Sequence, residues 1–166
     1  KREGDCVILI GGTRGHLRQS IYLREIEGKE EGAAPPVDLA VEKRNGEFVR
    51  GLIEQGRVDT AHDLSDGGLL VALAEMALPR GIGAAIEGGT IAFLFGEDQA
   101  RYLLAVPKSG AERILADAKS AGVPAVLLGR TAGDKIKIAN AGVSLADLKR
   151  AHEGWFPAYM AAPHSN

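Results

Sequence analysis

One uninterrupted apolar run near the start of the sequence constrains the fold more than any other feature. Residues Cys6 to Ile10 read CVILI, rich in β-branched side chains, and the pair Gly11-Gly12 ends the run. A strand with one side in water alternates apolar and polar residues, whereas a short run without alternation is typical of a strand buried on both faces. The sequence therefore predicts a parallel or mixed sheet at the centre of the protein.

The rest of the chain alternates between the two kinds of element. Apolar periodicity and turn residues predict strands at 58–64, 82–86, 101–107, 125–131 and 135–139, and helices at 21–25, 39–55, 67–78, 111–121 and 145–155. Asp38, Asp66 and Ser144 precede three of these helices and are the expected N-caps. Residues 101–131 read as a βαβ-like unit, and the alternation over 135–139 indicates an edge strand. The predicted fold class is α/β, with a mixed β-sheet flanked by helices.

Length and composition set further bounds. The 166 residues fit a single domain, expected over 1–160 with a loose tail at 161–166. A formal net charge of −2 gives no electrostatic basis for binding nucleic acid or anionic lipid. No segment has the apolar length of a membrane span, and the lone Cys6 resembles a core residue of a reducing compartment, so we expect a cytoplasmic protein. The sequence starts at Lys1 without an initiator Met, which suggests a piece of a longer chain.

The stretch AHDLSDGGLLVALAEMAL, residues 61–78, places titratable side chains and two glycines directly before an apolar helix. Backbone N–H groups at such a turn can approach a ligand closely, and a helix N-terminus favours phosphate. The carboxylates Asp63 and Asp66 would repel bare phosphate unless a hard cation such as Mg²⁺ lay between them. The segment therefore suits a metal-nucleotide or a polar substrate. The alternative, which the spacing favours equally, is that Ser65 and Asp66 only cap the helix and His62 is a hydrogen-bonded residue at a strand end.

Two other segments carry weaker signals. Gly11-Gly12-Thr13 follows the first strand, where open α/β sheets bind ligands, but it matches no dinucleotide or Walker motif, and a tight turn is the preferred interpretation. Glu97 and Arg101 could pair across a turn, or Arg101 could hold an anion; a surface ion pair of little energetic value is the preferred interpretation. The remaining histidines and the single cysteine lack the spacing of a metal cluster or a cysteine nucleophile.

Four segments together resemble a known family. GDCVILIGGTRGHLRQSIYLREI (4–26), PPVDLAVEKRNGEFVRGLIEQG (35–56), residues 61–78 and FGEDQARYLL (95–104) occur in this order. They resemble the carboxyl-terminal part of phosphoribosylformylglycinamidine synthases, in the superfamily of aminoimidazole ribonucleotide synthetase, selenophosphate synthetase and thiamine-monophosphate kinase. The resemblance covers nearly the whole chain.

The resemblance implies an aminoimidazole ribonucleotide synthetase C-terminal-domain-like fold and a role in ATP-dependent C–N ligation. No catalytic residue is assigned here, because the amino-terminal half of the parent is expected to supply those groups, together with most ATP contacts. The residues expected to line the nucleotide and substrate cleft are Gly11, Gly12, Thr13, Ser20, His62, Asp63, Ser65, Asp66, Gly67 and Gly68, with Asp63 and Asp66 as candidate Mg²⁺ ligands. Family members often have small residues where this chain has Arg18 and Gln19, which disfavours a close backbone-to-phosphate contact there.

The resemblance also implies partners. The run 155–160 resembles the end of the shorter form of the enzyme, which receives ammonia from a separate glutaminase subunit through a small bridging subunit. The other expected partner is the amino-terminal half of the same parent chain, and apolar surface left without it could drive formation of a homodimer. The isolated chain is expected to be inactive. Two alternatives stay open, a domain of another ATP enzyme of the superfamily, such as aminoimidazole ribonucleotide synthetase or a small-molecule kinase, and a mainly structural domain of the same enzyme.

Overall fold

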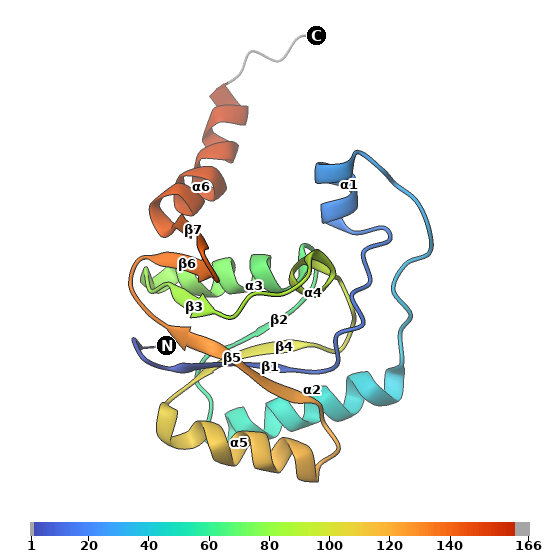
Figure 1. Cartoon of the computed structure of the whole chain (residues 1–166), viewed down its shortest axis with the longest axis vertical. Helices are drawn as coiled ribbons and strands as arrows, with labels where there is room; N and C mark the ends of the chain where they lie inside the picture. The colour runs from blue at the N-terminus through green and yellow to red at the C-terminus, as the bar shows by residue number, and fades with distance from the viewer. Residues whose placement is uncertain (1, 162–166) are drawn as a thin grey trace.

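The computed structural model describes residues 2–161 and contains one mixed sheet with helices on both faces (Figure 1). The strands are β1 (Cys6–Ile10), β2 (Ala61–Asp63), β3 (Ala84–Ile86), β4 (Tyr102–Val106), β5 (Ala125–Thr131), β6 (Lys135–Ile138) and β7 (Ala141–Ser144). The helices are α1 (Ile21–Glu27), α2 (Leu39–Glu54), α3 (Gly68–Ala77), α4 (Ile91–Phe95), α5 (Lys108–Ser120) and α6 (Leu145–Ala161), with a 3₁₀ turn, η1, at Leu78–Arg80. The predicted α/β class is confirmed.

The sheet has the strand order β2-β4-β1-β5-β3-β6-β7. β1 is antiparallel to β4 on one side and to β5 on the other, so β4 and β5 run parallel to each other with β1 between them. The predicted βαβ-like unit, β4-α5-β5, is therefore present in a split form. β3 and β6 are paired in parallel.

Both faces of the central strand are buried, as the run CVILI predicts. Val7 and Leu9 belong to a core that contains residues of α3 and of β1, β3, β4, β5 and β6. Cys6, Ile8 and Ile10 belong to a second core, made with α2, α5 and β4. In Figure 1, α2 and α5 lie below the sheet, and α3 and α4 lie above it. The alternating side chains of one strand thus anchor two helical layers.

Several sequence predictions were wrong in detail. The predicted strand 58–64 forms a ladder only at Ala61–Asp63. The strand at 135–139 is not an edge strand, because the unpredicted β7 pairs outside it. The last helix continues past residue 155 to Ala161, the first residue of the predicted loose tail; residues 162–166 lie outside the described part.

α1 and α6 lie at the periphery. α1 has no buried residue, and it contacts the body through Tyr22, whose ring centroid is 5.0 Å from that of Phe95. α6 begins at the buried Leu145 and extends away from the body (Figure 1). Within residues 2–161, no helix is both long enough and apolar enough to cross a membrane.

Candidate functional site

The loop between α4 and β4 holds together the two segments that the sequence singled out. Its Glu97 is 8% exposed, and one carboxylate oxygen, Oε1, accepts hydrogen bonds from the backbone N–H of Ile21 and of Gly67, each at 2.8 Å. Ile21 is the first residue of α1, and Gly67 lies just before α3. A single buried carboxylate therefore fixes the end of the first loop against the turn that contains Asp66.

The next carboxylate shapes the first loop. Asp98 is 7% exposed, and its Oδ2 accepts from the backbone N–H of Arg14 at 3.1 Å and of Gly15 at 2.8 Å. The backbone N–H of His16 lies 3.4 Å from Oδ1 of the same carboxylate. These three successive N–H groups form a small anion-binding concavity that the protein fills with its own side chain.

Arg101, directly before β4, completes the arrangement, and the predicted surface ion pair with Glu97 is wrong. Arg101 is 1% exposed, and its Nε donates to the carbonyl oxygen of Asp98 at 3.0 Å. Its Nη1 donates to Oγ1 of Thr13 at 3.3 Å, and its Nη2 donates to the carbonyl oxygen of Gly96. Burial lowers the pKa of Arg101, while the carboxylates of Asp98 and Glu97 raise it. The guanidinium is thus a buried cation that ties the loop 96–101 to the end of β1.

The first-loop residues have different environments. Gly11 is buried at a φ of +98°, and a Cβ there would lie 2.4 Å from the carbonyl oxygen of Ala100, so the chain needs glycine. Gly12 is exposed, and Thr13 is half-buried. Ser20 is buried and caps α1, accepting from the backbone N–H of Leu23 at 3.1 Å. Its structural role is therefore that of an N-cap at the end of the loop.

The bulky residues of this loop turn away from its interior. Arg18 packs against Gly32, where a Cβ would lie 2.4 Å from its Cδ. Gln19 adopts a φ of +57°, and its Nε2 donates to the carbonyl oxygen of Gly32 at 3.0 Å. A left-handed conformation is one that glycine adopts more easily, so the backbone at Gln19 would also suit a residue without a side chain.

The second segment exposes its acidic residues. The Asp63 side chain is 70% exposed, and Ser65 and Asp66 are also exposed. His62 is half-buried, with Nδ1 at 2.6 Å from the carbonyl oxygen of Asp63 and Nε2 at 3.5 Å from Oε2 of Glu75. Both aspartates are therefore available to a ligand from outside the domain.

The prediction that Asp66 caps α3 is wrong. The N-cap is Gly67, in the left-handed conformation at a φ of +77°, and no side chain caps the helix. Gly68 has a φ of +67°, and a Cβ there would lie 2.6 Å from the carbonyl oxygen of Gly96. The pair of glycines thus lets the turn pass against the loop 96–101 and leaves the Asp66 side chain outside the helix.

A charge interaction shows that Asp66 lies near Arg24 of α1. The pKa of Arg24 is raised chiefly by its hydrogen bond and charge interaction with Glu25, and to a smaller extent by the carboxylates of Glu30 and Asp66. Ile21 and Gly67 share the Glu97 carboxylate, so α1 and the turn before α3 are neighbours. The structure therefore brings Ser20, Asp66, Gly67 and Gly68 into one region, while Gly12 faces a different cavity, on the α2 side.

The carboxylates around the 61–68 turn bear on whether Mg²⁺ could bind here. In the described part of the chain, no group of three or more acidic, histidine or cysteine side chains gathers as a metal site. Mg²⁺ is commonly bound by one or two carboxylates, with substrate phosphates and water completing an octahedron. Asp63 and Asp66 are both exposed, and Asp63 lines a groove beside α2 that Asp66 does not line, so each could supply one carboxylate to an ion whose remaining oxygens come from a nucleotide and water.

Sequence reasoning missed Glu97 and Asp98 as organisers of both loops. The available signal was their position, since the two acidic residues lie in the short polar loop that leads into the strand 102–106. Loops that end buried strands expose backbone N–H groups, which nearby carboxylates can bind. The sequence alone does not reveal that β4 lies next to β1, and so it left this pairing open.

Comparison with known proteins places this arrangement in a family. Residues 2–140 match the family described as AIR synthase related protein, C-terminal domain. The chain is 56% identical over 170 aligned residues, 98% of its length, to the phosphoribosylformylglycinamidine synthase subunit PurL of Parvibaculum lavamentivorans. It spans 23% of that relative's length.

Solved structures of one Thermotoga maritima protein have the same fold. The T. maritima PurL complexed with FGAR superposes with a TM-score of 0.74 at 21% identity, covering 89% of this chain and 28% of that one. The ATP complex of that protein gives a TM-score of 0.66 at 20% identity, covering 88% and 26%, and the PurLQS structure gives 0.68 at 21%, covering 87% and 26%. These likenesses show a shared fold, and the sequence match over residues 2–140 shows that the chain belongs to the family of AIR synthase related C-terminal domains.

Proposed function

We propose that this chain is the C-terminal domain of an ATP-dependent phosphoribosylformylglycinamidine synthase of purine biosynthesis, and that it forms one wall of the nucleotide and substrate cleft. The 56% identity to a protein of that name, over 98% of the chain, supports the proposal. Because the chain spans about a quarter of that relative, the remaining three quarters would supply the catalytic groups and most contacts to ATP.

One observation carries the assignment of the cleft wall. The Glu97 carboxylate clamps α1 to the turn before α3, which leaves Asp63, Ser65 and Asp66 exposed beside a fixed backbone. A rigid backbone with outward-facing polar side chains is what a ligand-binding wall requires, since the groups are positioned before the ligand arrives.

In the proposed reaction, ATP phosphorylates the glycinamide carbonyl oxygen of formylglycinamide ribonucleotide and leaves as ADP, and ammonia then displaces that oxygen as inorganic phosphate to form the amidine. Asp63 and Asp66 would hold Mg²⁺ between themselves and the nucleotide phosphates, where the cation offsets charge repulsion. The T. maritima PurL, a longer protein with a domain of this fold, has been solved in complex with ATP, which supports a nucleotide in the cleft of the complete synthase. The loop residues of this chain contribute position and charge, and no proton transfer is assigned to them.

The first test measures turnover. The purified chain, supplied with ATP, Mg²⁺, ammonia and formylglycinamide ribonucleotide, should form no product. Adding the rest of the synthase polypeptide should restore product formation. Turnover by the chain alone would contradict the proposal, and so would a synthase that works equally well when this domain is deleted.

The second test concerns Asp66. In the synthase that contains this chain, Asp66→Asn should lower kcat/KM by about tenfold or more, because it removes a charge from the proposed metal-nucleotide contact. Its thermal stability should stay within about 0.5 kcal/mol, because the side chain caps no helix. The matched control is Asp134→Asn, at an exposed turn before β6, which should change neither quantity.

The same test distinguishes a cleft wall from a mainly structural domain. That alternative has support in the structure, because the buried charges of Glu97, Asp98 and Arg101 all bind backbone atoms. If Asp66→Asn leaves the activity of the synthase unchanged, the cleft assignment fails and the scaffold role remains.

The partners of the domain belong to the same proposal. The relative is named a subunit, and the T. maritima protein has been solved as PurLQS, which supports partner subunits such as the glutaminase and the small bridging subunit. The exposed apolar side chains at the end of α6, Trp155, Phe156, Tyr159 and Met160, would contact the rest of the parent polypeptide. Without that contact, the same surface would form a homodimer.

A further inference from the structure

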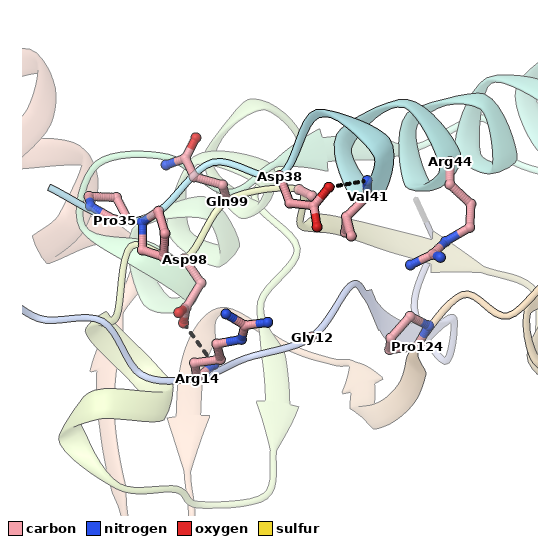
Figure 2. A pocket seen from close by; sticks show the side chains of 11 residues that line it. Gly12, Arg14, Pro35, Asp38, Val41, Arg44, Asp98, Gln99 and Pro124 are labelled. Carbon is pink, nitrogen blue, oxygen red and sulfur yellow. Dashed lines mark hydrogen bonds between the residues drawn. The ribbon is translucent and has the colours of Figure 1, made fainter.

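A cavity of about 210 Å³ lies between the end of β1 and the start of α2, and none of the residues 61–68 lines it. Figure 2 shows its wall, to which Gly12 and Arg14 contribute from the loop after β1, and Asp38, Val41 and Arg44 from α2. Ligand pockets for drug-sized molecules measure about 300–1,000 Å³, so this cavity suits one small group.

Two arginines of the cavity wall have guanidinium groups that are free to bind an anion. Arg14 comes from the first loop and Arg44 from α2, and in Figure 2 the Arg44 side chain extends from the helix towards Pro124 and Gly12. Within residues 2–161, neither guanidinium has a hydrogen-bond or ion-pair partner. Guanidinium forks bind phosphate oxygens in pairs, and two forks on one small cavity favour a doubly charged oxyanion.

The carboxylates of the wall are already occupied. Oδ1 of Asp38 accepts from the backbone N–H of Ala40 at 3.0 Å and of Val41 at 3.1 Å. Asp98 accepts from the backbone N–H groups after Gly12, as described above. Because backbone donors neutralise both carboxylates in part, the arginines remain the groups that can accept a new ionic partner.

The geometry points to a second binding site, in which Arg14 and Arg44 hold the phosphate group of a phosphate monoester. The prolines Pro35, Pro36 and Pro124 give the cavity an apolar, rigid rim on which the ester's carbon part rests. Adding a Cβ at Gly12 would meet no atom within 4 Å, so the backbone there leaves room for the oxyanion. The proposal is independent of the synthase reaction, because no residue of the 61–68 segment takes part in it.

The test is a calorimetric titration of the full chain with ribose 5-phosphate, inorganic phosphate and ribose at constant ionic strength. Ribose 5-phosphate should bind saturably and ribose should not. Tighter binding of the ester than of inorganic phosphate would identify a phosphate monoester as the ligand. Equal binding of the two would overturn the ester assignment and leave a site for free phosphate.

Variants locate the site. Arg14→Gln and Arg44→Gln should each weaken ribose 5-phosphate binding about tenfold or more, since each removes a charged hydrogen-bond donor. Arg44→Lys should fall between wild type and Arg44→Gln, because it keeps the charge but loses the planar fork. The control is Arg50→Gln, on the same helix but outside the cavity, which should bind like wild type. Circular dichroism checks that each variant is folded. Unchanged binding in both cavity variants, an equal loss in Arg50→Gln, or no saturable binding by the wild type would overturn the proposal.

Discussion

At the scale of the residue, the shape of the candidate site depends on carboxylates that bind backbone N–H groups. Glu97 alone joins two segments that are 46 residues apart in sequence, Ile21 and Gly67. Such bonds are stronger than those between neutral groups, because the acceptor is charged and mostly buried. Very few side chains therefore hold the two loops of the candidate site in place.

Removing the charge of the Glu97 carboxylate should lower the stability of the fold. In Glu97→Gln, the amide oxygen can replace Oε1 but accepts the two backbone N–H groups without the carboxylate charge, so we expect the free energy of unfolding to fall by about 2 kcal/mol. Urea denaturation followed by circular dichroism measures this change. The control is Glu87→Gln at an exposed position, with an expected change within about 0.5 kcal/mol. Equal stability of the two variants would show that the Glu97 bonds do not hold the loops.

Adjacent glycines provide a second test at this scale. Gly11→Ala forces a side chain into a φ of +98° and against the carbonyl oxygen of Ala100, which should cost about 2–4 kcal/mol. Gly12→Ala meets no atom within 4 Å and should change stability by no more than about 0.5 kcal/mol. Thermal melts of the two variants give the comparison. A similar loss in both would mean that the close approach of β1 to Ala100 is not what requires glycine.

At the scale of the element, sequence periodicity predicted the buried elements well. β1 and β5 have the predicted bounds, and Asp38 caps α2 as expected. These elements follow from local patterns, because an apolar run or a capping side chain acts within a few residues. β7 was missed because AGVS has almost no apolar alternation, and its ladder with β6 depends on a neighbour rather than on its own sequence.

The candidate site was predictable only in part, for a related reason. The glycines at 67–68 and the acidic residues around them mark a turn before a helix, and the sequence shows this directly. Arg101 was interpreted as a surface residue because charged side chains are rarely buried. Its burial follows from the position of β4 beside β1, a long-range pairing that local patterns do not contain.

Two of the three predicted caps, Asp38 and Asp66, make a matched experiment on helix ends. Asp38→Ala should lower stability by about 1 kcal/mol, because the backbone N–H groups of Ala40 and Val41 lose their acceptor. Asp66→Ala should change it by less than about 0.5 kcal/mol, since the left-handed Gly67 occupies the cap position of α3. Guanidinium denaturation of both variants measures the difference. A loss of about 1 kcal/mol for Asp66→Ala would restore the capping role that the structure denies it.

At the scale of the whole molecule, β1 is the element that unites the two cores. Leu9 points into the core with α3, and its neighbour Ile8 points into the core with α2 and α5. Strand pairing on both sides of β1 joins the remaining strands of the two cores. Loss of either core therefore removes support from the same central strand, and we expect the two helical layers to unfold together.

Truncation on each face of β1 tests this coupling. Leu9→Ala and Ile8→Ala should each cost about 2–5 kcal/mol, because each leaves a cavity beside fully buried neighbours. Hydrogen exchange followed by mass spectrometry should show faster exchange in α3 and in α5 alike for both variants, because opening is global. Val71→Ala, at an exposed position of α3, controls for simple loss of methyl groups and should leave α5 unchanged. Trp155 fluorescence is a poor substitute, since this side chain is 64% exposed on α6 and changes little in environment on unfolding. If Leu9→Ala accelerated exchange in α3 while α5 kept its protection, the two layers would be separate cooperative units, and β1 would support each of them independently.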